Sequence, residues 1–448
     1  MTTDYVVVDP STNETGQEYP TATDQDVQTA MASATKAHRE WSRSSTVDER
    51  ATLIHRVAQL HTQRQDELVE IIVREMGKPE AEAIEEVGFA AAIYDYYADN
   101  GPKFLADEPI EQEEGAGTAL IRRTSIGPLL GIMPWNFPYY QVSRFAGPNL
   151  MAGNTIILKH APQCPESAAA IAKIFLDAGF PEGAYVNLYA TNDQCADIIA
   201  DPRIQGISLT GSERAGAAVA EIAGRNLKKV VLELGGADPF ILLSTDDMDV
   251  AVQAAFDARY YNTGQACNGG KRVIVAGDIY EEFVAAFTEK VLATPNDAPM
   301  SSVQATDNLV KQVEQAVQGG ANLKTSGERN GAFYPPSVLT DVSHDSDTFH
   351  QELFGPVAMV FKVDSEEAAV ELANDTPFGL GSYVFTTDAD QAQRVADKLE
   401  VGMVFVNGVN ADSVELPFGG VKRSGFGREL GRYGIEEFIN KKLIRVVK

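Results

Sequence analysis

Residues 128–159 read PLLGIMPWNFPYYQVSRFAGPNLMAGNTIILK, and two short apolar runs, Pro128–Met133 and Thr155–Lys159, stand at the ends of this stretch. Apolar runs of this length are typical of strands that are covered on both faces in a parallel sheet. Further strands are expected at Tyr185–Tyr189, Ile204–Leu209 and Lys229–Leu234. Helices are expected between them, such as Pro165–Ala178, whose leading proline suits a first helical turn. This alternation predicts an α/β fold with a parallel sheet.

A second set of alternating strands and helices follows the Gly235-Gly236 pair and predicts a second α/β domain. Its expected strands are Arg272–Ala276, Val357–Val363, Ser382–Thr386 and Gly402–Val406. Ahead of both sets, apolar residues recur at spacings of three and four, which predicts helices. These helices are expected at Asp24–Trp41, Val47–Met76 and Ala81–Ala98, and Gly101-Pro102 is expected to end the run.

Two further segments indicate strands outside these domains. Residues 109–126 predict a hairpin around a Gly115–Gly117 turn. At the other end of the chain, Phe438–Val447 predicts a short strand. We expect this strand to be able to pair with the hairpin of a neighbouring subunit.

The 448 residues are enough for two or three coupled domains, and 64 acidic against 37 basic residues give a formal net charge of −27. The acids are spread along the chain, which argues against nucleic acid as a partner because its phosphates would be repelled. We expect a cytoplasm with high salt, where such a surface stays soluble. No apolar run reaches the roughly 18 residues that cross a bilayer, and the first residues lack a secretory signal. We therefore expect a cytoplasmic protein with no membrane partner.

Three cysteines are too few for a disulfide framework and indicate a reducing compartment. The six histidines do not pair with cysteines or carboxylates at zinc spacing, so no metal site is expected. One cysteine has an unusual setting: Cys267 lies in YNTGQACNGGKR, residues 261–272. A lone cysteine is usually a small buried hydrophobe. Here the glycines allow close approach of a substrate, and Lys271 and Arg272 favour a thiolate, so Cys267 is the candidate nucleophile. Cys164 and Cys195 are interpreted as structural.

Two polar residues at expected strand ends are candidate partners of this cysteine. Glu233 lies in VVLELGG, residues 230–236, and either faces water on a half-buried strand or is a desolvated base at the carboxyl edge of the sheet. A desolvated glutamate has a raised pKa and is a competent base near neutral pH. Asn136 lies in the rigid turn MPWNFP, residues 133–138. It either bonds its own backbone or supplies a fixed amide to an oxyanion hole.

The sequence has no Gly-x-Gly-x-x-Gly stretch for a dinucleotide. Instead, a strand leads into TGSERAG, residues 210–216, and then into a helix. Gly211 and Gly216 at a helix N-terminus can receive a pyrophosphate, although helices opened by glycine are frequent. Lys159, at a strand end, is either a ligand of ribose hydroxyls or a phosphate, or a surface lysine.

Taken together, these motifs resemble the aldehyde dehydrogenase superfamily over nearly the whole chain. The matching motifs are PWNFP at 134–138, LK at 158–159, TGS at 210–212, ELGG at 233–236, GQAC at 264–267, ELFGP at 352–356 and PFGGVKRSG at 417–425. The resemblance implies an enzyme that oxidises a small aldehyde to its acid with NAD or NADP as cofactor.

The resemblance also implies a role for each matching position. Cys267 would attack the aldehyde carbonyl, with the oxyanion held by the Asn136 amide and the Cys267 backbone N–H. Glu233 would activate the water that hydrolyses the thioester. The implied cofactor-binding residues are Pro134, Trp135, Lys159, Gly211, Ser212, Gly216, Glu352 and Phe354. Among these, Lys159 and Glu352 would hold riboses. Without the resemblance, Glu352 would be interpreted as a surface acid and Phe354 as a core residue.

The fold that the resemblance implies has three parts. Residues 1–108 and 127–234 would form a modified Rossmann cofactor domain. Residues 235–430 would form a second α/β domain that carries the nucleophile. Residues 109–126 and 431–448 would form a β-arm for assembly into homodimers or homotetramers.

Within the family, the chain resembles the shorter prokaryotic succinate-semialdehyde dehydrogenases. The resemblance places Arg144 where some of these enzymes hold the distal carboxylate of the substrate, and a structural ion pair is the equally weighted alternative. Two departures oppose a carboxylate: Tyr261 stands where relatives place a second arginine, and Asp412 lies in the pocket segment before Pro417. The position that often carries an acid in NAD-preferring members is Pro162, so NADP should be tolerated.

The expected function is oxidation of succinate semialdehyde or a similar semialdehyde to the carboxylate. A broad-specificity aldehyde dehydrogenase is the alternative. A CoA-acylating dehydrogenase is disfavoured because that class dispenses with a water-activating glutamate such as Glu233. A non-catalytic structural relative would have no physical reason to keep Cys267, Glu233, Asn136 and Lys159 together.

Overall fold

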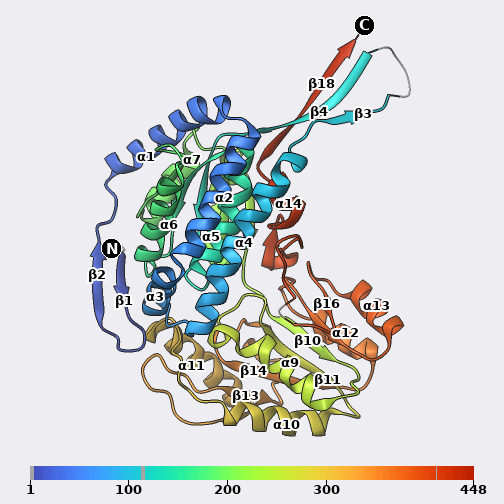
Figure 1. Cartoon of the computed structure of the whole chain (residues 1–448). Coiled ribbons are helices and arrows are strands. Elements are labelled where there is room, and N and C mark those ends of the chain that lie inside the picture. The colour runs from blue at the N-terminus through green and yellow to red at the C-terminus, as the bar shows by residue number, and fades with distance from the viewer. Residues whose placement is uncertain (1–4, 113–116, 410, 448) are drawn as a thin grey trace.

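The computed structural model describes residues 5–112, 117–409 and 411–447, which form two α/β layers and a projecting β-arm (Figure 1). The first layer is a six-stranded sheet in the order β17-β9-β8-β5-β6-β7. Its strands are β5 (Pro128–Ile132), β6 (Thr155–Lys159), β7 (Tyr185–Asn187), β8 (Gly206–Thr210), β9 (Lys229–Glu233) and β17 (Gly425–Phe426). All pairs are parallel except β17 with β9. The sheet therefore confirms the parallel strands expected from the sequence, with ends that differ by a few residues.

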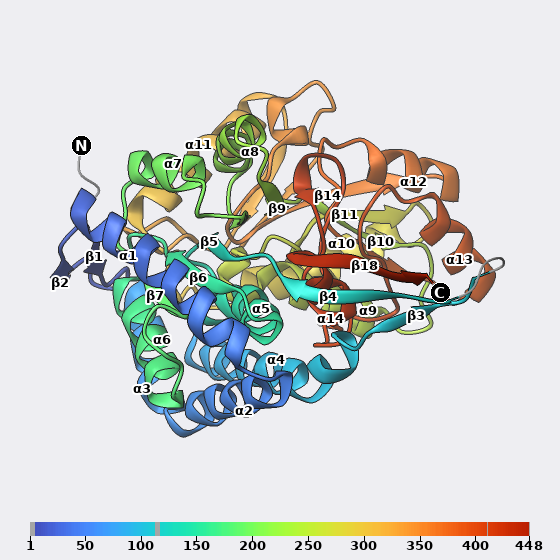
Figure 2. The ribbon, with the colours of Figure 1, turned by 90° about the horizontal axis from the view of Figure 1, so that it is seen from above.

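Alternate residues of these strands pack against opposite helical layers. Leu130 and Ile157 contact the cluster formed by α1, α7 and α8, whereas Leu129 and Ile156 face α2 to α6. This is the two-residue period of a strand, with both faces covered. The helices are α1 (Asp24–Ala37), α2 (Val47–Gln63), α3 (Gln65–Met76), α4 (Glu80–Phe104), α5 (Pro138–Ala152), α6 (Pro165–Ala178), α7 (Asn192–Ala200) and α8 (Glu213–Arg225). Seen from above, β5, β6 and β7 lie between the two helical layers (Figure 2).

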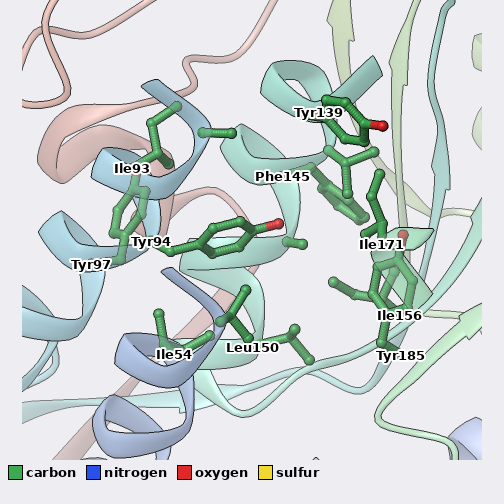
Figure 3. Packing of buried hydrophobic residues seen from close by; sticks show 14 of the residues in the cluster. Ile54, Ile93, Tyr94, Tyr97, Tyr139, Phe145, Leu150, Ile156, Ile171 and Tyr185 are labelled. Carbon is green, nitrogen blue, oxygen red and sulfur yellow. The ribbon is translucent and has the colours of Figure 1, made fainter. Parts of the chain in front are cut away.

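Aromatic rings fill the larger core between α4, α5 and the sheet. Tyr94 and Tyr97 of α4 are buried with Phe145 of α5 (Figure 3). Tyr185 of β7 stacks on Phe175 at 4.3 Å between ring centroids. Burial of large rings is a major source of stabilisation in such cores. This packing fixes α5, which begins directly after the Asn136 turn.

The second layer is a seven-stranded sheet in the order β12-β13-β14-β11-β10-β15-β16. Its strands are β10 (Asp238–Leu242), β11 (Gly270–Ala276), β12 (Asn322–Thr325), β13 (Ser337–Thr340), β14 (Val357–Val363), β15 (Tyr383–Phe385) and β16 (Phe405–Val406). The surrounding helices are α9 (Met248–Tyr260), α10 (Tyr280–Ala293), α11 (Val303–Gln318), α12 (Glu366–Asn374) and α13 (Ala389–Lys398). Sequence patterns identified β11, β14, β15 and β16, and they missed β10, β12 and β13.

The helices of the N-terminal region differ from expectation at three places. Gly101 and Pro102 do not end the run, because α4 continues through both to Phe104. A Cβ at Gly101 would lie 2.5 Å from Met151 of α5, so the glycine allows close packing of the two helices. That packing outweighs the hydrogen bond lost at Pro102. The expected helix Val47–Met76 is divided into α2 and α3 at Arg64. The expected helix Asp24–Trp41 ends as α1 at Ala37 and continues as the π-helical turn His38–Ser42.

The arm is a three-stranded antiparallel sheet of β3 (Glu108–Ile110), β4 (Gly117–Ser125) and β18 (Ile439–Val447). The hairpin is thus confirmed, although the middle of its predicted turn lies outside the described residues. The expected pairing of the C-terminal strand with a neighbouring subunit is wrong: β18 pairs with β4 of its own chain, from Ile439 opposite Ser125 to Val447 opposite Gly117. The helix α14 (Gly431–Glu436) returns the chain to the base of β4 and makes this local pairing possible.

An N-terminal hairpin, β1 (Tyr5–Val8) with β2 (Thr15–Tyr19), has no counterpart among the expected elements. Over the residues that the structure describes, no helix combines the length and apolar character needed to cross a membrane.

Asn154 joins the arm to the first sheet. Its side-chain oxygen accepts hydrogen bonds from the N–H groups of Ile126 (2.8 Å) and Gly127 (3.1 Å). Its Nδ2 donates to Asn149 Oδ1 (3.1 Å) and to the carbonyl of Phe438 (2.8 Å), and the side chain is fully buried. The start of β5 and the entry to β18 therefore depend on one amide.

We expect Asn154→Ala to lower the free energy of unfolding by about 3 kcal/mol, because each buried polar group left without a partner costs about 1–3 kcal/mol. The midpoint of urea unfolding, followed by circular dichroism, measures the loss. Asn226→Ala is the matched control, since the exposed side chain of Asn226 donates one hydrogen bond, to the carbonyl of Ile222. Equal midpoints for the two variants would contradict the joining role of Asn154.

Candidate active site

Cys267 lies in the turn between α9 and β11, after the 3-10 segment Tyr261–Gly264. Asn262 and Thr263 adopt positive φ angles of 53° and 54°, a conformation that non-glycine residues rarely take. Such backbone strain persists only where the surroundings impose it. The turn is therefore held in a single unusual shape.

Two buried cations impose this shape. The Lys271 Nζ donates to the carbonyl oxygens of Ala266 and Cys267, both at 2.7 Å. Arg259 donates to the carbonyl of Gly264 at 3.1 Å and to those of Leu353 and Gly355. Both cations have no exposed surface. The cysteine turn is thus tied to the segment that carries Glu352 and Phe354.

Asn136 lies opposite this turn. Its Nδ2 donates to the carbonyl of Gln265 at 3.1 Å, and Asn262 donates back to the carbonyl of Asn136 at 3.1 Å. An amide nitrogen carries two hydrogens, so one remains to donate after the bond to Gln265. The side chain is 4 % exposed and is held in a fixed orientation. A fixed amide with one free hydrogen is the kind of donor that an oxyanion hole uses.

The turn that carries Asn136 is itself anchored by a buried ion pair. Lys78 Nζ lies 2.5 Å from Glu86, and the other Glu86 oxygen accepts from the N–H groups of Tyr139 (2.9 Å) and Tyr140 (3.2 Å) at the start of α5. A carboxylate at a helix N-terminus satisfies donors that have no partner within the helix. The Lys78 ammonium lies 3.6 Å from the Phe137 ring centroid. Neither residue of this pair was identified from the sequence. The local sequence shows only two charged residues near an apolar helix, which does not predict a buried ion pair.

Glu233 ends β9 and is 2 % exposed, and neither carboxyl oxygen has a hydrogen-bond partner among the described residues. A Cβ at Gly419 would lie 2.7 Å from Glu233 Oε1, so the carboxyl group packs closely against this glycine. Burial raises the pKa of Glu233 well above its ordinary value, and the negative charge of buried Glu429 raises it further. The half-buried alternative for Glu233 is thus excluded.

Two cavities adjoin Cys267, and both are lined by Cys267 and Gln141. One, which we call the Ser212 cavity, has a volume of about 260 Å³. Its lining holds nine of the predicted site residues: Pro134, Trp135, Asn136, Gly211, Ser212, Glu233, Cys267, Glu352 and Phe354. The structure therefore brings the three predicted catalytic residues together with six of the predicted cofactor residues.

The other predicted cofactor residues lie outside this lining. Gly216 is inside α8, where a Cβ would lie 2.6 Å from Leu234, so it provides close packing between helix and strand. Lys159 ends β6, is 8 % exposed and makes no ion pair within the described part of the chain. Burial lowers the pKa of Lys159. Ser212 is the N-cap of α8 and accepts a hydrogen bond from Ala215.

The second cavity, which we call the Asp412 cavity, has a volume of about 380 Å³. Four acidic residues contribute to its lining: Glu85, Glu86, Asp257 and Asp412. Its lining residues include aromatic rings such as Phe89, Tyr140 and Phe418 but no lysine, arginine or histidine. Burial raises the pKa of Asp412, and Arg144 acts in the opposite direction. This cavity offers an aldehyde an aromatic and acidic environment.

Arg144 is fully buried and does not belong to the lining of this cavity, although its neighbours Tyr140 and Gln141 do. Its Nε is 2.8 Å from Glu429 Oε2, Nη1 donates to the Tyr140 hydroxyl at 3.2 Å, and Nη2 donates to Gln141. The guanidinium lies between the rings of Tyr140 and Phe418, at 4.6 and 4.3 Å from their centroids. A substrate carboxylate would have to displace the bonds to Tyr140 and Gln141 to reach it. The partner Glu429 was not foreseen from the sequence.

The electrostatics of Cys267 combine opposing effects. Burial raises the pKa of the Cys267 thiol to about 12, while Arg144 and Lys271 act to lower it. The expectation that Arg272 also favours the thiolate is wrong. Arg272 donates to the carbonyls of Leu372 (2.8 Å) and Ala373 (3.4 Å) and faces away from the cysteine turn. Neighbouring positions in a strand point to opposite faces, so only Lys271 turns toward Cys267.

Comparison with known proteins agrees with this geometry. A sequence model described as the aldehyde dehydrogenase family matches residues 1–444. The succinate-semialdehyde dehydrogenase [NADP(+)] of Deinococcus radiodurans is 48 % identical over 98 % of this chain and 94 % of its own length. The succinate semialdehyde dehydrogenase [NAD(P)+] of Escherichia coli is 43 % identical over 97 % of this chain and 96 % of its own. A crystal structure of succinic semialdehyde dehydrogenase from Streptococcus pyogenes with NADP+ superimposes with a TM-score of 0.96, at 39 % identity over 99 % of this chain and 100 % of that one.

We expect alkylation of Cys267 by iodoacetamide in the ligand-free protein to accelerate about tenfold per pH unit between roughly pH 7 and 9. The thiolate is the reactive form, and its fraction rises tenfold per unit while the pH stays below the raised pKa. Peptide mass spectrometry measures the rate, and Cys267→Ser controls for buried Cys164 and Cys195. A rate that levels off below about pH 8 would show that Arg144 and Lys271 outweigh burial.

Proposed function

The chain belongs to the aldehyde dehydrogenase family, and from that membership we propose that it oxidises succinate semialdehyde or a similar short semialdehyde to the carboxylate. Its relatives of this specificity share 42–48 % of the sequence over nearly the full chain. The observation that carries the proposal is the meeting of Cys267, Glu233 and Asn136 around one cavity. In this arrangement the nucleophile, the base and the oxyanion donor are each held in place by different parts of the fold.

The Ser212 cavity fits a nicotinamide dinucleotide, either NAD or NADP. Among the described residues, the buried hydroxyl of Thr210 in the lining of this cavity has no hydrogen-bond partner, and the buried ammonium of Lys159 has no ion pair. Both are suited to oxygen atoms of a ligand. Ser212 and Gly211 lie at the N-terminus of α8, where an anionic pyrophosphate is favoured. The side chains of Lys159 and Glu352 would hold riboses, and Trp135 and Phe354, whose ring centroids are 5.7 Å apart, would line the nicotinamide end. Bound there, the dinucleotide supplies the hydride acceptor.

The residues of the chain perform the remaining chemistry. The thiolate form of Cys267 attacks the aldehyde carbon, and the free hydrogen of the Asn136 amide and the Cys267 N–H stabilise the oxygen that becomes negative. Lys271 keeps the cysteine turn fixed while this charge develops. After oxidation to the thioester, Glu233 accepts a proton from water, which attacks the thioester carbon. The carboxylate product leaves and Cys267 is free again. A CoA-acylating reaction has no use for this water-activating base.

A broad-specificity aldehyde dehydrogenase is the second candidate, and the acidic lining of the Asp412 cavity favours it. A carboxylate in this cavity would face like charges, whereas a neutral aldehyde would meet mainly aromatic rings. The positive charge of Arg144 opposes this repulsion of a carboxylate, since it acts to lower the pKa values of both Asp412 and Cys267. Binding of the distal carboxylate by Arg144 stays a proposal.

We further propose that residues 1–108 and 127–234 bind the dinucleotide, that residues 235–430 carry the catalytic cysteine, and that the arm supports a homodimer or homotetramer. One exception is β17, which belongs to the second segment and completes the first sheet. The arm has exposed apolar residues that support association: Ile110, Leu443, Val446 and Val447. The net charge of −27 and three free cysteines support a reducing cytoplasm rich in salt.

The proposal predicts a higher kcat/KM for succinate semialdehyde than for propanal, with either NAD or NADP, at high KCl concentration. Formation of the reduced dinucleotide is followed by its near-ultraviolet absorbance. Asp412→Ser tests the role of charge: the KM for succinate semialdehyde should fall roughly tenfold because a repulsive charge is removed, and the KM for propanal should stay the same. If both the unmodified enzyme and Asp412→Ser preferred propanal, the assignment of succinate semialdehyde as substrate would be overturned. The broad-specificity aldehyde dehydrogenase would then be the supported function.

Glu233→Gln should lower kcat about a hundredfold or more, because general-base catalysis of thioester hydrolysis is lost. The first turnover should survive as a burst of reduced dinucleotide close to one per Cys267. In the unmodified enzyme, hydrolysis should speed up as the pH rises through the raised pKa of Glu233, because only the ionised carboxylate accepts a proton. This rise should be absent in the variant. If the burst vanished together with kcat, Glu233 would be needed before the thioester forms.

A further inference from the structure

Three potential metal ligands meet at the end of α12, on the second sheet. His344 Nε2 lies 2.6 Å from Asp375 Oδ2, and His350 Nε2 lies 3.7 Å from Asp375 Oδ1. One ligand atom from each residue lies within 4.8 Å of the other two. Two imidazoles and a carboxylate are a ligand set that suits zinc and related divalent metals. Neither the proposed active site nor its cavities include these residues.

Two of the three ligands stand on fixed backbone. His350 ends the 3-10 helix Asp347–His350, in which Thr348 donates to the carbonyl of Gln312 in α11 at 3.1 Å. Asp375 is the C-cap of α12, and its N–H donates to the carbonyls of Glu371 and Leu372. His344 is the adjustable member, since its side chain is 67 % exposed. A site with two fixed ligands needs only a small movement of the third to enclose an ion.

The surroundings also fit coordination. His350 Nδ1 is buried and has no hydrogen-bond partner among the described residues, so Nε2 is its outward-facing ligand atom. His344 Nδ1 lies 3.9 Å from Asp345, and a carboxylate beside the second nitrogen is a common support for a metal-bound imidazole. The cation Arg272 stacks on Phe349 at 4.9 Å and opposes a second positive charge. Its hydrogen bonds, however, go to the carbonyls of Leu372 and Ala373, and they leave both oxygens of Asp375 to the histidines.

We propose that His344, His350 and Asp375 bind a divalent cation of the zinc type, with water completing the coordination. The expectation of no metal site came from local spacing, and these ligands come together only through the fold. The ion would tie the end of α12 to the segment that runs from His344 into Glu352 and Phe354. Glu352 and Phe354 at the end of that segment line the Ser212 cavity, so the ion would restrain one wall of the proposed dinucleotide site.

The test uses the untagged full chain with Cys267→Ser, which removes the partly buried thiol of Cys267, the most accessible of the three cysteines, as a competing ligand. Zn²⁺ is titrated by calorimetry, and Co²⁺ is titrated by its visible absorption. We expect one ion per chain and a Kd that rises at least about tenfold in His350→Asn and in Asp375→Asn, because even outer-shell changes cost 10- to 100-fold. Asp375 is partly exposed, so its variant should fold even if that of His350 does not.

The matched control is His55→Asn. His55 also contacts two carboxylates, Asp95 at 2.8 Å and Asp99 at 3.2 Å, but through opposite ring nitrogens, so no single ion can join all three. The Kd of the His55→Asn variant for Zn²⁺ should equal that of the parent Cys267→Ser protein. Equal affinity in all three variants, or an equal loss in His55→Asn, would overturn the site.

Hydrogen exchange measures the proposed restraint separately from binding. With Zn²⁺ present, exchange in the segment 344–354 should slow in the parent and stay unchanged in His350→Asn. Binding without this protection would overturn the restraint on the wall of the Ser212 cavity. Because neither readout uses turnover, the outcome is independent of the proposed aldehyde oxidation.

Discussion

The buried ammonium of Lys271 is the contact on which the arrangement of the site depends. It donates to the carbonyls of Ala266 and Cys267 and lies 3.3 Å from Glu352. Glu352 in turn accepts from the N–H of Gly236, directly after the strand that ends in Glu233. A single cation therefore connects the nucleophile turn, the ribose-binding candidate and the strand of the base. An unpaired charge in the interior is expensive, so these partners must stay in place for Lys271 to remain buried.

The same burial sets the chemistry of the acidic and thiol groups. Within the described part of the chain, the carboxyl group of Glu233 has no hydrogen-bond partner, and burial and the charge of Glu429 favour its neutral form. Arg144 offsets part of this cost, since it pairs with Glu429 and its charge also reaches Cys267. A base with a raised pKa and a thiol with a raised pKa are the consequence of a dry site. Burial makes Glu233 a stronger base, but it also disfavours the thiolate of Cys267. The positive charges of Arg144 and Lys271 offset this second effect by acting to lower the pKa of the thiol.

The sequence predicted the parallel strands of the first sheet well, because fully covered strands leave continuous apolar runs such as Thr155–Lys159, but it missed the parallel strands β10 and β13 of the second sheet. It failed where tertiary contacts outweigh local preference, as at Gly101-Pro102, which α4 passes through because Gly101 packs on Met151. It identified Cys267, Glu233 and Asn136, which lie in motifs of special composition. It did not find Glu429, Gln141 or the Lys78–Glu86 pair, because their partners are distant in the chain and local patterns hold no signal for such contacts. Which of Lys271 and Arg272 points toward Cys267 could not be predicted, because that depends on the register of β11 in the sheet.

Two kinds of negative charge bear on an anionic substrate, and salt separates them. The overall charge of −27 acts over distances that salt screens, since the Debye length falls to about 3 Å near 1 M. Asp412 is partly buried in the lining of its cavity, so its repulsion is screened less than that of charges on the open surface. High salt would therefore help a semialdehyde to reach the cavity without making the cavity more favourable. Discrimination between charged and neutral aldehydes is then decided by the balance of Asp412 against Arg144, whose positive charge acts to lower the pKa of Asp412.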